Sequence, residues 1–218
     1  GSWLDASVWQ KLNSGTWETT TTPPHFGTGH ISFIESGHIV ITPHSVDLNA
    51  TYANSYGYVN SIVVKEGGKL IVESGKTLNI HKEQLYQIDG EFENNGTVGN
   101  DGKYDLIING TATNNGTLKV DQPGSNVFVK GKLINKSSVN YNNVTVKDGG
   151  TYEHAANSNT MPTNIIFENG STFLVSGIST SQTGILKNSI NYYNIIWDNP
   201  NQTKYYAFQG NLAENVRG

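Results

Sequence analysis

The acidic residues between positions 89 and 105 are the first candidates for chemistry. A pair of carboxylates can cleave a glycosidic bond when the two groups face it from about 5–10 Å apart. The candidates are Asp89, Glu91, Glu93, Asp101 and Asp105. The sequence contains neither an Asp-Asp pair nor a Gly-His-Gly turn, and these acids lie in or beside Gly- and Asn-containing turns. The pattern favours a solvated turn face, so no catalytic residue is predicted.

One acidic segment, NDGKYD at 100–105, has oxygen atoms at alternating positions. Asp101, the backbone carbonyl of Lys103 and Asp105 are ligands of the type that Ca²⁺ prefers. The segment lacks the distal bidentate Glu of an EF-hand, and an ordinary Asp-Gly turn is the alternative. It is a candidate structural calcium site, and no other cofactor is predicted. The six His residues show no HxH or HExxH spacing, so zinc is not expected either.

Aromatic residues gather near the C-terminus. The cluster comprises Tyr192, Tyr193, Trp197, Tyr205, Tyr206 and Phe208. Flat aromatic rings stack on sugar rings, so the two Tyr pairs and Trp197 are predicted carbohydrate-binding residues. Neighbouring residues on a strand point to opposite faces, which would leave one Tyr of each pair exposed. The alternative is that these rings close the C-terminal end of the core.

A repeated motif predicts the elements that must position these residues. The motif reads GEFENNGTV at 90–98, GTATNNGTL at 110–118 and, loosely, GKLINKSSV at 131–139. Asn94, Asn114 and Asn135 recur after 20 and 21 residues. Such a period is typical of a β-solenoid, in which equivalent residues stack about 4.8 Å apart. We therefore expect an Asn ladder, the alternative being a set of independent hairpin turns.

Short β-type runs separated by Gly and Asn turns fill the rest of the chain. Strands are predicted at 38–41, 61–64, 69–72, 77–80, 105–108, 117–120, 126–129, 144–146, 164–167, 172–175 and 193–197. The only predicted helical turns are 3–12 and 82–86. Alternation places one set of side chains inside: Ile62, Val64, Leu70, Val72, Leu78, Ile80, Phe92, Val98, Ile108, Leu118, Val120, Leu133, Val144, Val146, Phe167 and Phe173.

These patterns predict an all-β fold, a single-stranded right-handed parallel β-helix with coils of about 20–21 residues. Residues 1–30 are predicted to cap the solenoid, and residues 31–218 to form it, as one domain overall. A solenoid end exposes its core and open strand edges, so it needs such a cap. Trp3, Trp9 and Trp17 would cover the first coil, with sugar stacking as their alternative role.

Composition excludes several classes of protein. The chain has 218 residues, only 15% of them charged, a net charge of −4 and no cysteine. A disulfide framework and a thiolate metal site are therefore excluded. No run approaches the ~18 apolar residues of a membrane span. Arg217 is the only arginine in this acidic chain, so nucleic acid is not an expected partner.

The N-terminal half resembles a known group of proteins. The residues that carry the likeness are Trp9, GTW at 15–17, the Pro pair at 23–24, HIVI at 38–41, IVVKEGGKLIV at 62–72 and GKTL at 75–78. They are similar to the start of right-handed parallel β-helix proteins exported by Bacteroidetes, over residues from about 9 to 120. A weaker likeness links them to a glycine-rich extracellular β domain found beside sugar-processing modules. The resemblance implies a secreted or cell-surface location and a longer, multidomain parent chain.

Two functions follow as expectations. The first is a non-catalytic, extracellular bacterial surface module that binds a polysaccharide or cell-surface glycan, mediates adhesion, or serves as a rigid spacer. The alternative is a polysaccharide-degrading β-helix enzyme, a lyase or hydrolase, or the non-catalytic front part of one. Such lyases commonly use Arg or Lys as the base. Arg217 is penultimate, and Lys130 or Lys132 with Asp121 is the only lysine-based set that stands out, so whether the chain is an enzyme is left uncertain, with the balance toward no.

Overall fold

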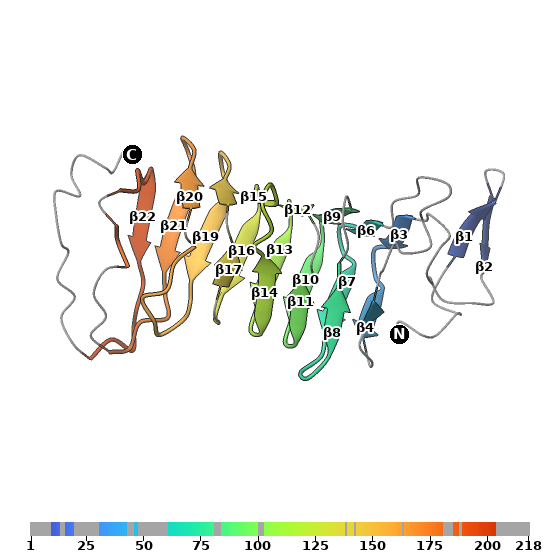
Figure 1. Cartoon of the computed structure of the whole chain (residues 1–218), viewed down its shortest axis with the longest axis horizontal. Helices are drawn as coiled ribbons and strands as arrows, with labels where there is room; N and C mark the ends of the chain where they lie inside the picture. The colour runs from blue at the N-terminus through green and yellow to red at the C-terminus, as the bar shows by residue number, and fades with distance from the viewer. Residues whose placement is uncertain are drawn as a thin grey trace.

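The computed structural model describes residues 10–13, 16–19, 31–42, 46–47, 61–80, 84–99, 103–137, 139–141, 143–162, 164–180, 185–187 and 189–203. All regular structure in these ranges is β, and most of it lies in three parallel sheets that run along the long axis of the molecule (Figure 1). The sheets stack as a β-solenoid of about six turns. The predicted parallel β-helix is therefore confirmed.

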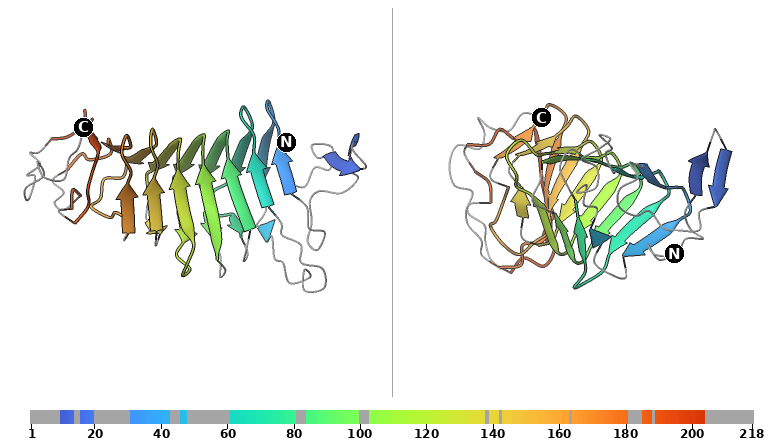
Figure 2. Two further views of the ribbon diagram at one scale, coloured as in Figure 1. Left: turned by 90° about the horizontal axis from the view of Figure 1, so that it is seen from above. Right: turned by 45° about the vertical axis from the view of Figure 1, so that its right-hand side comes forward.

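Each turn of the solenoid contributes one strand to each sheet over most of its length. Sheet I contains β3 (Ile31–Ile34), β6 (Ser61–Val64), β9 (Gln84–Ile88), β12 (Tyr104–Ile108), β15 (Asn126–Val129), β18 (Asn143–Val146) and β20 (Asn164–Phe167). Sheet II contains β4 (Ile39–Thr42), β7 (Lys69–Val72), β10 (Glu91–Asn94), β13 (Thr111–Asn114), β16 (Lys132–Asn135), β19 (Thr151–His154), β21 (Thr172–Val175) and β22 (Asn194–Trp197). Sheet III contains β5 (Val46–Asp47), β8 (Thr77–Asn79), β11 (Thr97–Gly99), β14 (Thr117–Val120) and β17 (Val139–Tyr141). Figure 2 shows the strands of successive coils side by side.

The interior is built by alternation along every strand. In β7, for example, Leu70 and Val72 are buried while Lys69 and Ile71 are partly exposed. All sixteen side chains predicted to face inward are buried, which confirms that prediction. Four buried tyrosines were not among the side chains predicted to face inward: Tyr86, Tyr104, Tyr152 and Tyr192. Tyr86 and Tyr104 contact edge to face at 5.8 Å between ring centroids, so rings as well as aliphatic columns fill the core.

The predicted Asn ladder is confirmed. The Asn94 Nδ2 donates to Asn114 Oδ1 at 2.8 Å, and the Asn114 Nδ2 donates to Asn135 Oδ1 at 2.9 Å. All three side chains are buried, and their strands pair in parallel register. The Asn135 Nδ2 ends this run on the carbonyl of Ser137 at 2.7 Å. Each buried amide thus finds a partner one coil away, as burial of a polar group requires.

The stacking of the glycines differs in one place from the spacing in the sequence. Gly96 and Gly116 stack, since Thr97 pairs with Thr117. Gly75 does not join them, because Thr77 pairs with Thr97 and places Lys76 opposite Gly96. The turn before β8 is shifted by one residue relative to the turns before β11 and β14. Gly75 and Gly96 are therefore not equivalent, although they are 21 residues apart.

Both predicted helical turns are wrong wherever the structure describes them. Residues 10–12 belong to β1 (Gln10–Asn13), which pairs antiparallel with β2 (Thr16–Thr19). Residues 84–86 belong to β9, in which Tyr86 pairs with Leu106 and Ile62 of the neighbouring coils. In β9, parallel pairing with the strands of both neighbouring coils overrides a weak local helix preference.

Coil length is less uniform than the repeat suggested. Ile34 pairs with Val64, thirty positions later, whereas Val127 pairs with Val144, seventeen positions later. The middle of the solenoid keeps the predicted 20 or 21 residues, as in the pairs that Asn114 makes with Asn94 and Asn135. Insertions and deletions fall at the corners, where they leave the sheet register intact.

The predicted N-terminal cap lies mostly outside the described residues, including Trp3 and Trp9. The described part of it is the β1–β2 ribbon, which forms a sheet of its own beside the three parallel sheets. Trp17 pairs with Leu12 across this ribbon. That the segment covers the first coil stays a prediction.

Candidate functional site

The outer face of sheet II carries charges that pair with one another across coils. The Lys69 Nζ lies 3.4 Å from a Glu91 carboxylate oxygen and 2.9 Å from one of Glu93. The Lys132 Nζ lies 2.7 Å from Glu153. Hydrogen bonds from Asn95 and then Lys69 lower the pKa of Glu93, while the bond to Glu93 raises the pKa of Lys69. These carboxylates are already engaged by neighbouring cations and amides.

The outer face of sheet III carries a row of hydroxyl groups. Thr77, Thr97 and Thr117 occupy equivalent positions on β8, β11 and β14, and each side chain is partly exposed. The row is short, since sheet III has five strands against seven and eight in the other two sheets. It presents no aromatic ring beside the hydroxyls within its described side chains.

The outer face of sheet I carries a polar row, here named the Asx row. Its members are Asp105, Asn126, Asn143 and Asn164. The Asn126 Nδ2 donates to Asp105 Oδ1 at 2.8 Å, and the backbone amide of Asn126 donates to the same oxygen at 3.1 Å. The Asn164 Nδ2 reaches Asn143 Oδ1 at 3.5 Å. Because each residue stands one coil from the next, the row runs along the solenoid axis.

A second outward row lies two residues further along the same strands, and we name it the apolar row. Its members are Ile107, Phe128, Thr145 and Ile166. Ile166 is 61% exposed, and Ile107 and Phe128 are partly exposed. Apolar side chains of this size at the surface of a sheet are candidates for contact with a ligand. The two rows together form an amphipathic strip over four coils.

The Phe128 ring contacts a neighbouring ion pair. The Lys147 Nζ lies 5.4 Å from the ring centroid, within the range of a cation–π contact. The same Nζ lies 2.6 Å from Glu168 Oε1. Phe128, Lys147 and Glu168 thus form one chain of contacts across three successive coils.

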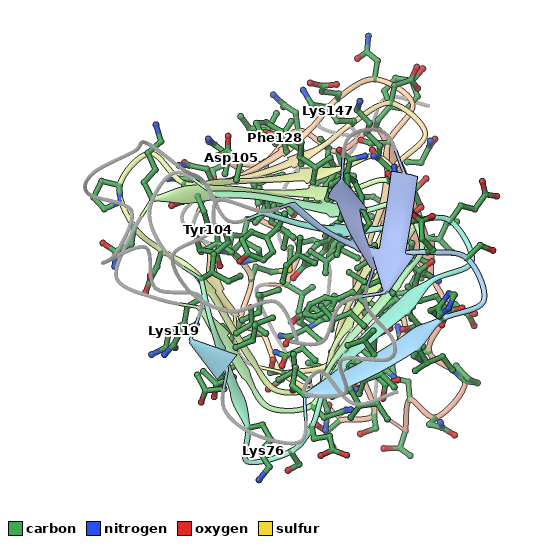
Figure 3. The ribbon with its side chains drawn as sticks, turned by 90° about the vertical axis from the view of Figure 1, so that its right-hand side faces the viewer. Lys76, Tyr104, Asp105, Lys119, Phe128 and Lys147 are labelled. Atoms are coloured by element: carbon green, nitrogen blue, oxygen red, sulfur yellow. The ribbon has the colours of Figure 1, made fainter. Side chains whose placement is uncertain are left out.

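Figure 3 looks along the solenoid and separates the three faces. Asp105, Phe128 and Lys147 lie together along the upper side, which is the outer face of sheet I. Lys119 and Lys76 lie on a different side of the molecule. The aromatic ring, the carboxylate and the ordered lysine therefore belong to a single face.

The predicted carbohydrate-binding aromatic residues do not form one surface in the described part of the chain. Tyr192 is only 1% exposed, and its ring stacks on Phe173 with centroids 5.3 Å apart. Its hydroxyl accepts a hydrogen bond from the backbone amide of Lys187 at 3.0 Å. Tyr192 therefore belongs to the core and has no free ring face for a sugar.

The other predicted carbohydrate-binding residues are Tyr193, Trp197, Tyr205 and Tyr206. Tyr193 is partly exposed, but the predicted strand from residue 193 begins one residue later, at Asn194, so neither Tyr192 nor Tyr193 belongs to β22. Trp197 packs against the core, and its Nε1 donates to Gln202 Oε1 at 2.8 Å. Tyr205 and Tyr206 lie outside the described residues.

The predicted calcium segment is described only in part. Asp101 lies outside the described residues, and Lys103 is exposed. Asp105 lies on β12 and is a member of the Asx row, with one carboxylate oxygen accepting both hydrogen bonds from Asn126. Within the described ranges, no three His, Cys, Asp or Glu side chains gather as a metal-binding group.

The remaining candidates for catalysis are separate from one another. Asp89 accepts hydrogen bonds from Gln87 at 2.9 Å and from Asn109 at 2.7 Å. Lys130 is exposed at the end of β15, and Lys132 is paired with Glu153 on sheet II. Asp89 follows β9, Lys130 follows β15 and Lys132 lies on β16, so the three side chains come from different elements.

Sequence reasoning missed the Asx row, although a signal for it existed. Four of the sheet I strands carry an Asx residue two positions before an outward apolar or Thr residue, as in Asp105 and Ile107 or Asn126 and Phe128. The signal was hidden because Asn126 and Asn143 are only seventeen positions apart.

The comparisons with known proteins identify no relative. No protein family, no curated protein and no solved structure matches the chain. The resemblance to exported proteins of Bacteroidetes therefore stays a prediction. In the part of the chain that the structure describes, no helix is long and apolar enough to cross a membrane.

Proposed function

We propose that this chain is a non-catalytic module of the bacterial cell surface that binds polysaccharide on the outer face of sheet I. The observation that carries the proposal is the Asx row beside the apolar row, with the partly exposed Phe128 ring between Ile107 and Thr145. Proteins bind sugar rings by combining an apolar or aromatic contact with a few fixed polar groups. The strip supplies both on a rigid sheet.

The extracellular location is supported by sequence properties. The chain has no cysteine, 24 glycines and a surface rich in Asn, Thr and Ser. The predicted resemblance to exported β-helix proteins points in the same direction. Surface proteolysis of intact cells that express the parent protein, followed by detection of peptides from residues 103–180, tests this location. Protection of those peptides until the cells are lysed would contradict it.

Affinity electrophoresis in gels that contain single polysaccharides tests the binding function. The wild-type chain is expected to be retarded by at least one polymer, and Phe128→Ala is expected to lose that retardation. Thr113→Ala is the matched control, because Thr113 is also an outward, partly exposed residue but lies on sheet II. Retardation of the Phe128→Ala variant equal to that of the wild type would place binding elsewhere.

Two other outcomes would change the proposed function. If no polysaccharide retards the chain, the solenoid acts as a rigid spacer, the role to which its continuous core and Asn ladder are also suited. If ultraviolet absorbance detects unsaturated products from uronate polymers, with or without Ca²⁺, the chain is a lyase and the non-catalytic assignment is wrong.

A further inference from the structure

The hydrogen bonds within the Asx row determine which groups point outward. The Asn126 Nδ2 donates both to Asp105 Oδ1 at 2.8 Å and to the carbonyl of Gly124 at 3.2 Å. Both of these partners are acceptors, so they fix the amide orientation of Asn126. The Asn143 Nδ2 similarly donates to the carbonyl of Ser125 at 3.2 Å.

The row is consequently rich in acceptors. Among the described residues, no donor reaches the second carboxylate oxygen of Asp105, the Oδ1 of Asn126 or the Oδ1 of Asn164. A ligand that satisfies these oxygens must bring its own donors. Sugar hydroxyl groups are such donors. Carboxylate or sulfate groups are not, and Asp105 would repel them.

The dimensions of the face favour a linear ligand over a protein partner. Strands of four residues are about 13 Å long, and the six steps from β3 to β20 cover about 29 Å, which gives roughly 400 Å². A stable protein interface buries about 800 Å² on each partner. The Asx row itself spans three steps, or about 14 Å. A narrow, axial strip of this length fits several units of an extended sugar chain.

We infer that the ligand is a linear, neutral polysaccharide that lies along the solenoid axis, across the strands of sheet I. Its hydroxyl groups donate to Asp105, Asn126 and Asn164, and the apolar faces of its rings lie on the apolar row. Successive sugar units contact successive coils, so affinity grows with chain length up to the length of the row. This inference rests on the proposed polysaccharide-binding function.

Isothermal titration calorimetry with a length series of β-1,4-linked gluco-oligosaccharides tests the inference. We expect the affinity to rise about 10-fold from the disaccharide to the tetrasaccharide and then to level off, once the chain exceeds the ~14 Å row. β-1,4-linked mannuronate oligosaccharides of the same lengths should bind at least about 10-fold more weakly, since they place carboxylates near Asp105.

Two variants test which side chains of the Asx row contact the oligosaccharide. Asn126→Ala should weaken binding of the neutral tetrasaccharide about 10-fold, as loss of a fixed hydrogen-bond partner predicts. Asp105→Asn keeps a side-chain oxygen and removes the charge. Because the second carboxylate oxygen becomes an NH₂ group, the variant should weaken binding of the neutral tetrasaccharide by about 3- to 10-fold, and loss of the charge should bring the uronate series closer to the neutral one. Thr113→Ala on sheet II should change neither series.

The possible results distinguish a failure of the inference from a failure of the proposed polysaccharide-binding function. Uronates that bind more tightly than neutral chains, or an affinity independent of length, would overturn the inference while Phe128-dependent binding still supports the module. Unchanged tetrasaccharide binding by a folded Asn126→Ala variant would also overturn it. If neither oligosaccharide series binds and no polymer gel retards the chain, the proposed function itself fails.

Discussion

At the scale of single residues, the two asparagines of each Asn-Asn-Gly turn have different roles. Asn94 and Asn114 point inward, are buried and form the interior ladder. Asn95 and Asn115 point outward, where the Asn115 Nδ2 donates to Asn95 Oδ1 at 2.8 Å. The same side chain in adjacent positions thus contributes either a buried or a solvent-accessible hydrogen bond, and the two contributions differ in free energy.

Asn114→Ala should strongly destabilise the fold. The change leaves a donor of Asn94 and the Oδ1 of Asn135 without their partner inside the core. Each unsatisfied buried group costs about 1–3 kcal/mol, so the free energy of unfolding should fall by about 2–6 kcal/mol. Guanidinium denaturation measures it. Asn115→Ala, the exposed neighbour, is the control and should lose less than about 1 kcal/mol. Equal losses would show that burial does not set the ladder's contribution.

The interior ladder position in the next coil is occupied by His154, which should make stability depend on pH. Its Nε2 bonds the carbonyl of Ser158 at 2.7 Å, while its buried Nδ1 has no partner among the described residues. Burial lowers the pKa of His154, and the bond to Ser158 opposes this only in part. The unfolded chain therefore binds the proton more readily than the folded chain does.

The sign of the pH effect follows from this difference. The contribution of neutral His154 to the free energy of unfolding is fully present above about pH 6.5, the ordinary pKa of His. This contribution is lost as the pH falls through the lowered pKa of the folded state. Thermal unfolding followed by circular dichroism between about pH 7 and pH 5 should show a falling midpoint. His154→Asn, which has no titrating group, should reduce this slope. An unchanged slope would assign the pH dependence to other groups.

At the scale of the elements, a column of glycines sets how closely the coils approach before three successive strands of sheet II, β10, β13 and β16. The column runs through Gly90, Gly110 and Gly131, and the backbone amide that follows each glycine bonds the carbonyl of the glycine one coil before it, as in Thr111 to Gly90 at 2.9 Å. A Cβ atom on Gly131 would lie 2.0 Å from the carbonyl oxygen of Gly110. These glycines are required by close backbone approach.

Gly131→Ala should therefore destabilise the solenoid by more than about 2 kcal/mol, because backbone of two coils must separate. Gly75→Ala is the comparison, since Gly75 has a φ of +72° but open space around its Cβ position. It should cost only the left-handed penalty of about 1–2 kcal/mol. Urea denaturation of both variants measures the difference. A smaller loss for Gly131→Ala than for Gly75→Ala would show that the coils are not tightly stacked at this column.

At the scale of the whole molecule, each coil contacts mainly its two neighbours, so the fold extends along one axis. Eight strands of sheet II give seven steps, or about 34 Å, of stacked backbone. Small-angle X-ray scattering should give an asymmetric pair-distance distribution with a long tail, as an elongated particle does. A symmetric, bell-shaped distribution would contradict the solenoid.

The sequence alone predicted the parts of the fold that repeat. A coil cannot bury its apolar side chains by itself, so similar inward residues must recur in each coil. This recurrence is visible in the sequence as the period of the Asn and Gly residues. Phe92, Val98 and the ladder residues Asn94, Asn114 and Asn135 could be assigned on that ground. The β9 strand could not, because it is defined by its pairing with the strands of both neighbouring coils.

Only the tertiary structure decided which residues share an outer face. The seventeen-residue coil between Val127 and Val144 breaks the period, so the alignment of Asn126 with Asn143 appears only once the strands are paired. The packing of Tyr192 on Phe173 was likewise a matter of three-dimensional contact, since a Tyr pair on a strand is symmetric in sequence. Inward positions repeat because the core demands them. Which outward residues become neighbours depends on the strand register, and the register is established only when the coils pair.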